Sequence, residues 1–262
     1  IVRYYAADGS FFPRRQAMCT LIIVRDVFTG YPLVVIANHD ERLDRPAGPP
    51  KYWDRRPIPI LATVDEEAGG TWIGVSERGL FAAVTNRDDV PYVPGRPTRG
   101  TLVMTALEAP SATEARRRIE AVGGEMNGFN LVVADRNAAY RISGGGEKRI
   151  SYNIASGLTV VTEQGCDTGT PGTRAHGIAR RFRQIKDAEF DRHVLNDNLL
   201  AECDHSPVRS GTCIHNDDLN YGTRSSAILW ASDGWRAFTY WHREGRPCRH
   251  GFGTPMVLPI WK

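Results

Sequence analysis

The sequence predicts an α+β fold in which antiparallel β-sheets are covered by helices. Short apolar segments come in pairs separated by turn residues, as in antiparallel hairpins. The predicted helices stand in groups between blocks of strands, which is not the strict alternation of a doubly wound parallel sheet. The sequence contains no internal repeat and no low-complexity linker. We therefore expect a single domain over residues 18–262, preceded by an extension or propeptide of residues 1–17.

Two strand pairs are predicted in the first third of the chain. Residues 19–25 and 31–38 are rich in β-branched side chains and flank a turn-like Phe-Thr-Gly segment, which indicates a hairpin. A polar, proline-rich segment over residues 39–59 is expected to be a loop. Residues 71–76 and 80–86 form a second predicted hairpin, joined through a Glu-Arg-Gly turn.

Two helices are predicted next, and groups of strands and helices follow them. The first helix covers residues 100–108, and Pro110 separates it from the second. Ser111 and Glu114 have capping-box spacing, so the second helix covers residues 111–122. The remaining predicted strands cover residues 129–135, 139–144, 157–162, 225–231 and 235–242, and an Asp-Gly turn joins the last two. The remaining predicted helices cover residues 173–186 and 191–203.

Composition and charge argue against two classes of partner. The net charge is +3, and two short arginine runs, at residues 116–118 and 180–181, fall in predicted helices without interleaved aromatic residues. We therefore expect no nucleic-acid partner. No apolar stretch approaches the ~18 residues of a membrane span, and residues 1–17 lack the apolar middle of a signal peptide. The prediction is a cytoplasmic protein without membrane contact, with assembly into a homo-oligomer left open.

Five cysteines, an odd number spread widely along the chain, argue against a disulfide framework. Cys203, His205, Cys213 and His215 form a Cys-x-His…Cys-x-His pattern of zinc-type ligands, but the one-residue gaps are tighter than the usual spacing of such sites. We interpret these residues as parts of a loop and a helix end, with a bound metal as the alternative. The prediction is therefore no metal and no cofactor.

Cys19 directly follows Met18 at the start of the first predicted strand. One interpretation is a buried strand cysteine, since free cysteines are often buried. The other is a nucleophile that carries a free α-amine. A thiol with a pKa of ~8.5 needs a base at neutral pH, and an α-amine with a pKa of ~7.7–8.0 on the same residue can take its proton. Peptidases that remove Met accept a small following residue, so loss of Met18 would expose this amine.

Six segments occur in an order that resembles a known family: MCTLIIVRD, YPLVVIANHDERLDRPAGPP, GGTWIGVSERGLFAAVTNRDD, PGRPTRG, FNLVVAD and YGTRSSAILW. The family is that of the transport and Golgi organisation protein 2, also called NRDE proteins after an Asn-Arg-Asp-Glu motif. The resemblance extends from Met18 to about Trp241, and the motif reads Asn-His-Asp-Glu here. This family resembles the N-terminal nucleophile hydrolases, such as bile-salt hydrolases and penicillin V acylases. The resemblance implies a four-layer αββα sandwich whose central strands include residues 19–25, 33–38, 72–76 and 80–85.

The resemblance also implies a catalytic site. In such hydrolases a Met-Cys start loses its Met and the cysteine attacks an amide, which makes Cys19 the nucleophile. Asn38 and Asp40 match an Asn-x-Asp after the second strand, and hairpin pairing returns Asp40 near Cys19, where its carboxylate can orient the amine. Pairing of Asp40, as a loop carboxylate, with Arg42 or Arg45 is the alternative. Asn86 matches an oxyanion donor at a strand end, with a turn cap as its alternative.

Further residues complete the predicted site. Arg224 precedes a late strand and is expected to hold a substrate carboxylate or to help place Asp40, with a structural salt bridge as the alternative. Asn38, His39 and Trp72 are predicted to contact the substrate.

The predicted function is a cysteine N-terminal-nucleophile amidohydrolase or acyltransferase that acts on a small amide substrate and matures by autoproteolysis or loss of Met18. The alternative is a non-catalytic protein that handles haem or lipid on the same fold, since the resemblance links the family to both. Cys19, Asp40 and Asn86 favour the enzyme. A second oxyanion Asn, which the resemblance implies after a later strand, is replaced by Thr162 or Glu163, which favours the alternative.

Overall fold

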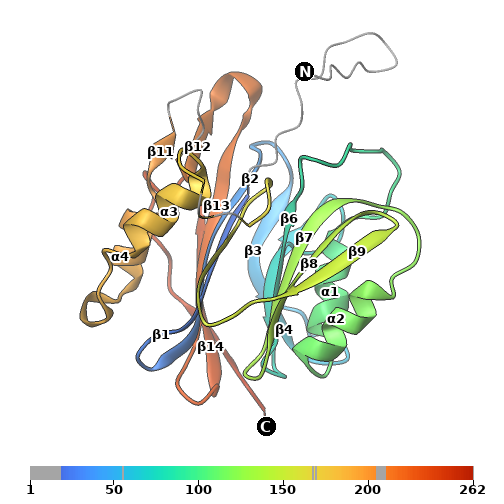
Figure 1. The fold of residues 1–262 in the computed structure, drawn as a ribbon, viewed down its shortest axis with the longest axis horizontal. Helices are drawn as coiled ribbons and strands as arrows, with labels where there is room; N and C mark the ends of the chain where they lie inside the picture. The colour runs from blue at the N-terminus through green and yellow to red at the C-terminus, as the bar shows by residue number, and fades with distance from the viewer. Residues whose placement is uncertain (1–18, 55, 167, 169, 205–210, 262) are drawn as a thin grey trace.

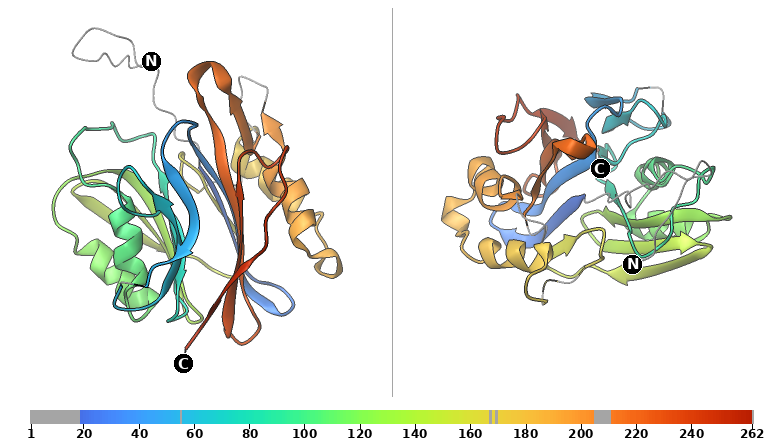
Figure 2. Two further views of the ribbon diagram at one scale, coloured as in Figure 1. Left: turned by 180° about the vertical axis from the view of Figure 1, so that it is seen from behind. Right: turned by 90° about the horizontal axis from the view of Figure 1, so that it is seen from above.

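The computed structural model describes residues 19–54, 56–166, 168, 170–204 and 211–261. Within this part of the chain, the strands form two β-sheets that pack face to face, and helices cover both outer faces (Figure 1). The views from behind and from above show the same layers (Figure 2). The predicted αββα sandwich is confirmed, because the two sheets lie inside and the helices outside.

The first sheet has the predicted β1–β2 hairpin near its centre. Its eight described strands run in the order β10-β1-β2-β13-β12-β11, and β14 and β15 continue from β13. Their bounds are Thr20–Phe28 (β1), Tyr31–Arg42 (β2), Gly157–Val161 (β10), Cys203–Asp204 (β11), Cys213–Asn216 (β12), Tyr221–Ala231 (β13), Ala237–Glu244 (β14) and Met256–Pro259 (β15). Strand β13 pairs with β2 along one edge and shares its other edge between β12 and β14. The end of β14 therefore lies beside β12.

The second sheet is a meander in which the described strands β3 to β9 lie in chain order, each antiparallel to the next. Their bounds are Ala47–Tyr52 (β3), Ile60–Asp65 (β4), Ile73–Ser76 (β5), Phe81–Asn86 (β6), Met126–Ala134 (β7), Ala139–Gly146 (β8) and Lys148–Asn153 (β9). The predicted hairpin of β5 and β6 is confirmed, and its turn uses the left-handed backbone of Gly79, with a φ of 78°.

Alternation of side chains along the strands separates an inner core from two outer ones. In β1, Leu21 and Ile23 point between the sheets, whereas Ile22 and Val24 pack in the outer cluster that includes helix α3. Helices α1 and α2 cover the second sheet in the same way. The helices are α1 (Gly100–Leu107), α2 (Ala112–Glu120), α3 (Arg174–Phe182) and α4 (Arg192–Leu195). Helix α2 begins as predicted, with the Ser111 hydroxyl accepting a hydrogen bond from the Glu114 N–H.

Two predicted segments differ from the structure. The proline-rich segment 39–59 is not one loop, because β2 continues to Arg42 and β3 follows at the edge of the second sheet. An edge strand tolerates the two prolines of β3, since one side of it needs no ladder hydrogen bonds. The predicted helix 191–203 is interrupted, because α4 ends at Leu195 and a π-helical turn over Asn196–Leu200 follows.

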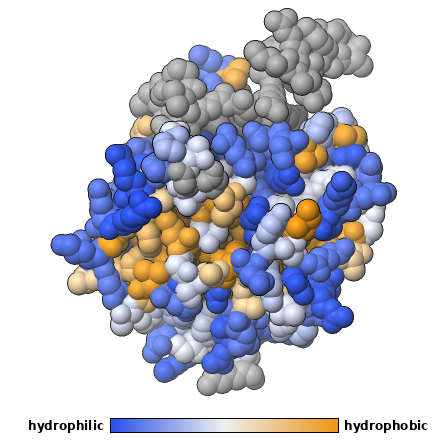
Figure 3. All heavy atoms as spheres, in the orientation of Figure 1, coloured by the Kyte–Doolittle hydropathy of each residue, from blue (hydrophilic) through white to orange (hydrophobic). Residues whose placement is uncertain are grey.

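In the described part of the chain, no helix combines the length and the apolar character that crossing a membrane would require. Apolar side chains reach the surface in the middle of the face in Figure 3, on the side of α3 and α4, and hydrophilic side chains frame them. The cytoplasmic location and the division into an extension and one domain remain predictions.

Candidate active site

Cys19 lies directly before β1, where β1 is flanked by β2 on one side and β10 on the other. Thr20 pairs with Asn38 across β2, and Leu21 pairs with Val161 across β10. The pairing with β2, extended by one residue, brings residue 39 opposite Cys19, and the pairing with β10, extended by two, brings residue 163 opposite it from the other side. The side chain is buried, 6% exposed, and its Sγ is 3.6 Å from the backbone carbonyl oxygen of Asp40. The predicted proximity of Cys19 and Asp40 is therefore present.

The thiol of Cys19 is held in its protonated form. Burial raises its pKa above the ordinary value, and the negative charge of Asp40 adds to this effect, followed by the charges of Glu41 and Glu163. A thiol in these surroundings cannot ionise on its own at neutral pH. Nucleophilic chemistry at Cys19 therefore requires a base that takes its proton.

The carboxyl group of Asp40 is buried, 1% exposed, and has one occupied and one open oxygen. The Thr223 hydroxyl donates a hydrogen bond of 2.5 Å to Oδ1, and among the described residues no donor reaches Oδ2. Burial raises the pKa of Asp40 to about 7, against the opposing effects of Arg174 and the Thr223 hydrogen bond. Asp40 thus exchanges a proton near neutral pH and has an oxygen available for one more donor.

A second buried carboxylate, Glu163, follows β10, and sequence analysis did not include it among the catalytic residues. Its Oε2 lies 3.2 Å from Nη1 of Arg174 on helix α3, and both side chains are buried. Arg174 Nη1 also lies 3.4 Å from the hydroxyl of Thr20. Burial raises the pKa of Glu163, while Arg174 lowers it. The signal for Glu163 was its position after a strand; no local pattern marked Arg174.

Two of the predicted substrate-binding residues are brought together: His39 from β2 and Trp72 from the position directly before β5 of the other sheet. Their rings stack with centroids 4.7 Å apart and an interplanar angle of 15°. Burial lowers the pKa of His39 to about 4, so the imidazole is neutral at physiological pH. Thr20 pairs with Asn38, so the register continued by one residue brings His39 opposite Cys19, and we expect the stacked pair to form a flat, uncharged wall beside the thiol.

The third predicted substrate-binding residue, Asn38, is directed elsewhere. Its side chain is fully buried, donates hydrogen bonds to the carbonyls of Leu200 (3.2 Å) and Thr212 (2.7 Å), and accepts one from the Ser226 hydroxyl (2.6 Å). These contacts anchor β2 to β12, β13 and the π-helical turn. The structure therefore gives Asn38 an anchoring role.

Asn86 and Arg224 are not brought into contact with Cys19 or Asp40 by any hydrogen bond among the described residues. Asn86 ends β6, in which alternate side chains from Ala82 onward face the helix layer rather than the space between the sheets. Arg224 donates to the carbonyls of the β2–β3 turn, at 3.0 and 3.3 Å, and pairs with Glu244. This arrangement matches the structural salt bridge that the sequence left open.

The alternative partners of Asp40, Arg42 and Arg45, form ion pairs with other carboxylates. Arg45 pairs with Asp65 at 2.9 Å and with Glu67 at 2.9 Å, and Arg42 pairs with Glu67 at 3.2 Å.

A cation near the thiol comes instead from Arg99, the residue before α1. Burial lowers the pKa of Arg99, whereas negative charge on Cys19 and on Glu41 raises it, so the guanidinium lies within electrostatic reach of a Cys19 thiolate. Arg99 belongs to the PGRPTRG segment on which the family resemblance depends, but its own role had no local signal.

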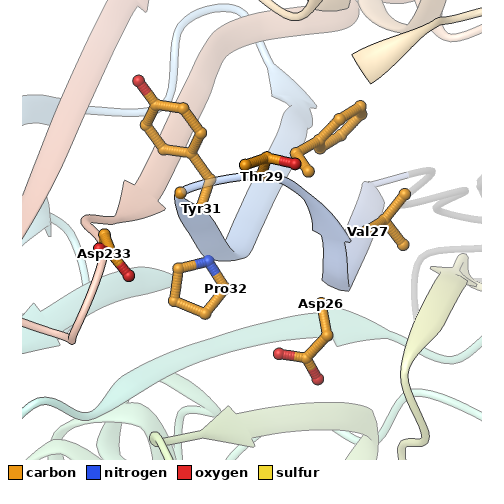
Figure 4. A pocket seen from close by; sticks show the side chains of 8 residues that line it. Asp26, Val27, Thr29, Tyr31, Pro32 and Asp233 are labelled. Atoms are coloured by element: carbon orange, nitrogen blue, oxygen red, sulfur yellow. The ribbon is translucent and has the colours of Figure 1, made fainter.

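A surface pocket of about 280 Å³ lies at the β1–β2 turn, where Asp26, Tyr31 and Asp233 surround it (Figure 4). Cys19 is at the opposite end of β1, about 25 Å away at the usual rise of a strand. This pocket is therefore separate from the candidate active site.

Comparison with known proteins supports the fold and the family. The family model for Transport and Golgi organisation 2 matches residues 18–243. The Transport and Golgi organization 2 homolog of Mus musculus is 35% identical over 109 residues, which is 40% of this chain and 39% of the mouse protein. The Homo sapiens homolog is 34% identical over 113 residues, or 42% of this chain and 41% of that protein. The chain thus spans about two fifths of the length of the curated relatives it matches.

Two solved structures share the architecture. An N-acylethanolamine-hydrolyzing acid amidase ortholog of Caenorhabditis elegans superposes with a TM-score of 0.57 at 15% identity, covering 80% of this chain and 92% of that one. A mutant of conjugated bile acid hydrolase from Clostridium perfringens also gives 0.57, at 11% identity, covering 93% of this chain and 92% of that one. At these identities the likeness shows the fold alone.

Proposed function

The chain belongs to the Transport and Golgi organisation 2 family, and we propose that it is a cysteine amidohydrolase or acyltransferase whose nucleophile is Cys19 with a free α-amine. One observation carries the proposal: the Cys19 sulfur contacts the backbone carbonyl of Asp40, whose buried carboxyl group is within electrostatic reach of the thiol, is held by Thr223 and has an oxygen without a donor among the described residues. The fold likeness to an N-acylethanolamine-hydrolyzing acid amidase and to a conjugated bile acid hydrolase supports it.

A free amine on Cys19 would supply a hydrogen-bond donor to the open oxygen of Asp40. Cleavage of the peptide bond before Cys19 converts an amide N–H into an amine with a pKa of ~7.7–8.0. In its ammonium form this group places a positive charge beside Asp40 and lowers the pKa of the carboxyl from its present value of about 7. Oδ2 then accepts a hydrogen bond from the amine and orients it toward the sulfur.

The reaction then proceeds by acyl transfer. The neutral α-amine takes the proton of the Cys19 thiol as the sulfur attacks the amide carbonyl. The tetrahedral intermediate collapses to a thioester when the amine passes its proton to the leaving nitrogen. Water releases the acid in a hydrolase, and another nucleophile takes the acyl group in an acyltransferase. Asp40 keeps the amine in place through both steps and touches no substrate atom.

The surroundings of Cys19 indicate the kind of acyl group. The stacked pair of His39 and Trp72 is flat and uncharged, which suits an apolar or planar acyl chain. Arg99 supplies positive charge for the developing oxyanion or for a substrate carboxylate. Asn86 stays the sequence-based candidate for an oxyanion donor, although its strand position directs it to the helix layer.

A non-catalytic binding protein on the same fold is the second candidate, and Glu163 is the observation that favours it. A carboxylate across the β1–β10 register from Cys19 opposes both the thiolate and an oxyanion beside it. Its ion pair with Arg174 offsets this charge in part. The remaining negative charge would suit a protein that binds a ligand without a reaction at Cys19.

A trapping experiment distinguishes the two functions. A chain that begins at Met18 is produced in cells, and intact-mass spectrometry tests whether Cys19 has become the first residue. The mature protein is incubated with N-acyl p-nitroanilides of increasing acyl length, and the expected result is p-nitroaniline release together with an acyl adduct on Cys19. Cys19→Ala should show neither, whereas Cys166→Ala, the matched control at an exposed cysteine, should show both. Processed protein that binds fatty acid but gives no adduct with any acyl length would support the binding function.

A further inference from the structure

Four metal-ligating side chains meet at a second place in the first sheet. Cys203 lies on β11, Cys213 and His215 lie on β12, and Cys248 lies in the turn after β14. Their three sulfur atoms and one imidazole nitrogen all lie within 4.8 Å of one another. None of the three cysteines is in a disulfide. The group therefore offers one imidazole and three thiols at a single point.

Three of the six spacings are close to the edges of one coordination tetrahedron, and the other three, to Cys203, are within 4.8 Å. With Zn–S bonds of ~2.3 Å and Zn–N bonds of ~2.0–2.1 Å, tetrahedral ligands stand ~3.8 Å apart for S···S and ~3.6 Å apart for S···N. The Sγ atoms of Cys213 and Cys248 are 3.5 Å apart. Nε2 of His215 is 3.4 Å from the Cys213 sulfur and 3.3 Å from the Cys248 sulfur. A disulfide would need a sulfur separation of ~2.05 Å.

The fold holds these ligands in place from several sides. Because β13 shares one edge between β12 and β14, the turn after β14 returns to β12. Gly222 permits the close approach of β12, since a Cβ atom there would lie 2.7 Å from the Ile214 carbonyl oxygen. Arg243 donates to the carbonyl of His250 at 2.9 Å, and Arg246 pairs with Asp217, so both ends of the turn that carries Cys248 are fixed.

The charge around the cluster suits a metal thiolate. One Zn²⁺ with three thiolates and a neutral imidazole carries a net charge of −1. Arg249 exerts its positive charge on Cys203, and Arg243 lies within electrostatic reach of Cys213 and Cys248. Soft thiolate ligands with imidazole in tetrahedral geometry select zinc among the common divalent ions.

We propose that Cys203, Cys213, His215 and Cys248 bind one Zn²⁺ ion in a closed, structural site. Four protein ligands leave no position for water or substrate, so the ion braces the fold and performs no chemistry. This replaces the expectation of no metal. The sequence pattern had pointed to His205, which lies outside the described residues, and had not included Cys248, which is 33 positions after His215 and reaches the site only through the topology.

The site is connected to Asp40 through β12. The N–H of Ile214, between the two ligands of that strand, donates to the Thr223 hydroxyl at 2.8 Å, and Thr223 donates to Asp40. The carbonyl of Thr212 accepts a hydrogen bond from Asn38. Zinc would thus fix the strand that supports the Asp40 network, as a positioning element, whether or not Cys19 is catalytic.

Metal analysis of the full chain tests the proposal. The protein is purified under reducing, chelator-free conditions, and mass spectrometry of the metals is expected to find about one zinc per chain. Cys248→Ser should lose most of this zinc, and Cys166→Ser, also at an exposed cysteine, should keep it. Replacement of zinc by Co²⁺ should give the intense visible bands of a tetrahedral cobalt thiolate. Chelation of the unaltered chain should lower its Tm by more than about 5 °C, and added zinc should restore it.

Alkylation provides a readout that does not depend on a variant. Iodoacetamide should label Cys166 in the native protein, and Cys248 only after chelation. If Cys248→Ser fails to fold, the chelation and labelling of the unaltered chain still decide the question. Three results would overturn the proposal: no stoichiometric uptake of zinc by the reduced protein, a disulfide within the cluster in reduced preparations, or the absorption of an iron–sulfur centre in place of zinc.

Discussion

Two thiol sites lie on the same sheet, one on each side of β13, and their surroundings differ in kind. Cys19 is a single thiol among carboxylates, with Asp40 and Glu163 close to it and one oxygen of Asp40 without a donor among the described residues. The cluster around Cys213 has three thiols and an imidazole that face one another, with arginines outside. The first arrangement holds the thiol protonated and leaves room for one more group. The second is closed and suits a cation shared by four ligands.

The difference shows that burial alone does not decide what a cysteine does. Burial raises the pKa of both Cys19 and Cys213. The two cysteines differ in the nearest group that can take the thiol proton or, as a cation, bind the sulfur in its place. At Cys19 the proposed partner is an amine made by cleavage of the chain, and at Cys213 it is the proposed zinc ion.

The largest expected effect is that one substitution inactivates the first thiol site and leaves the second intact. Cys19→Ala should remove all acyl-enzyme formation, because it deletes the proposed nucleophile, and it should leave the zinc content at about one per chain. Mass spectrometry of the acyl adduct and metal analysis of the same sample measure both quantities. Loss of zinc in Cys19→Ala would show that the two sites are not independent.

Local sequence signals predicted the parts of the fold that depend on neighbouring residues. The β1–β2 hairpin, its Cys19–Asp40 proximity and the Ser111 cap follow from alternation, turn residues and capping-box spacing. The edge strand β3 was missed because its prolines indicate a loop when the position of a strand within the sheet is unknown.

The parts of the site that were missed depend on contacts between distant segments. Glu163 meets Cys19 only because β10 pairs with β1, and Arg174 reaches it from a helix on the outer layer. Cys248 joins the cysteine cluster only because β12 and β14 share an edge of β13. No spacing along the sequence encodes these pairings. The stacking of His39 on Trp72 likewise required the two sheets to pack face to face.

A second, smaller effect concerns the pH dependence of stability. The folded chain binds the Asp40 proton more tightly than the unfolded chain, because the pKa is about 7 in the fold and 3.8 for an ordinary aspartate. Between these values the unfolded state loses its proton first, so the stability of the chain with residues 1–18 still attached falls as the pH rises. Asp40→Asn, which keeps the neutral form, should stabilise that chain by up to about 4 kcal/mol at pH 8 and by about 1 kcal/mol at pH 4.5.

Urea denaturation at the two pH values measures this effect, with Cys19→Ala as the common background so that the chain stays uncleaved. Equal gains at both pH values would contradict a raised pKa of Asp40. In processed protein the sign should reverse, because the ammonium of Cys19 lowers the pKa of Asp40 and Asp40→Asn then loses an ion pair.

The smallest expected effect concerns Thr223, whose hydroxyl is the link between the two sites. It donates to Asp40 at 2.5 Å and accepts from the Ile214 N–H at 2.8 Å. Thr223→Val keeps the shape of the side chain but leaves a buried N–H without its acceptor, which costs about 1–3 kcal/mol of stability.

Thr223→Val also removes a hydrogen bond that lowers the pKa of Asp40, so the pH at which turnover reaches half its maximum should rise. Turnover should therefore fall most on the acid side of the pH profile, where the carboxyl becomes protonated. Thr223→Ser restores the hydroxyl and should recover both stability and the pH profile. Because the β12–β13 pairing and the contacts of Arg243 and Arg246 also hold the zinc ligands, zinc content should stay at about one per chain in both variants. A Thr223→Val protein that loses zinc together with activity would mean that β12 is positioned by the Asp40 network, and the direction of support between the two sites would be the reverse of that argued for the metal.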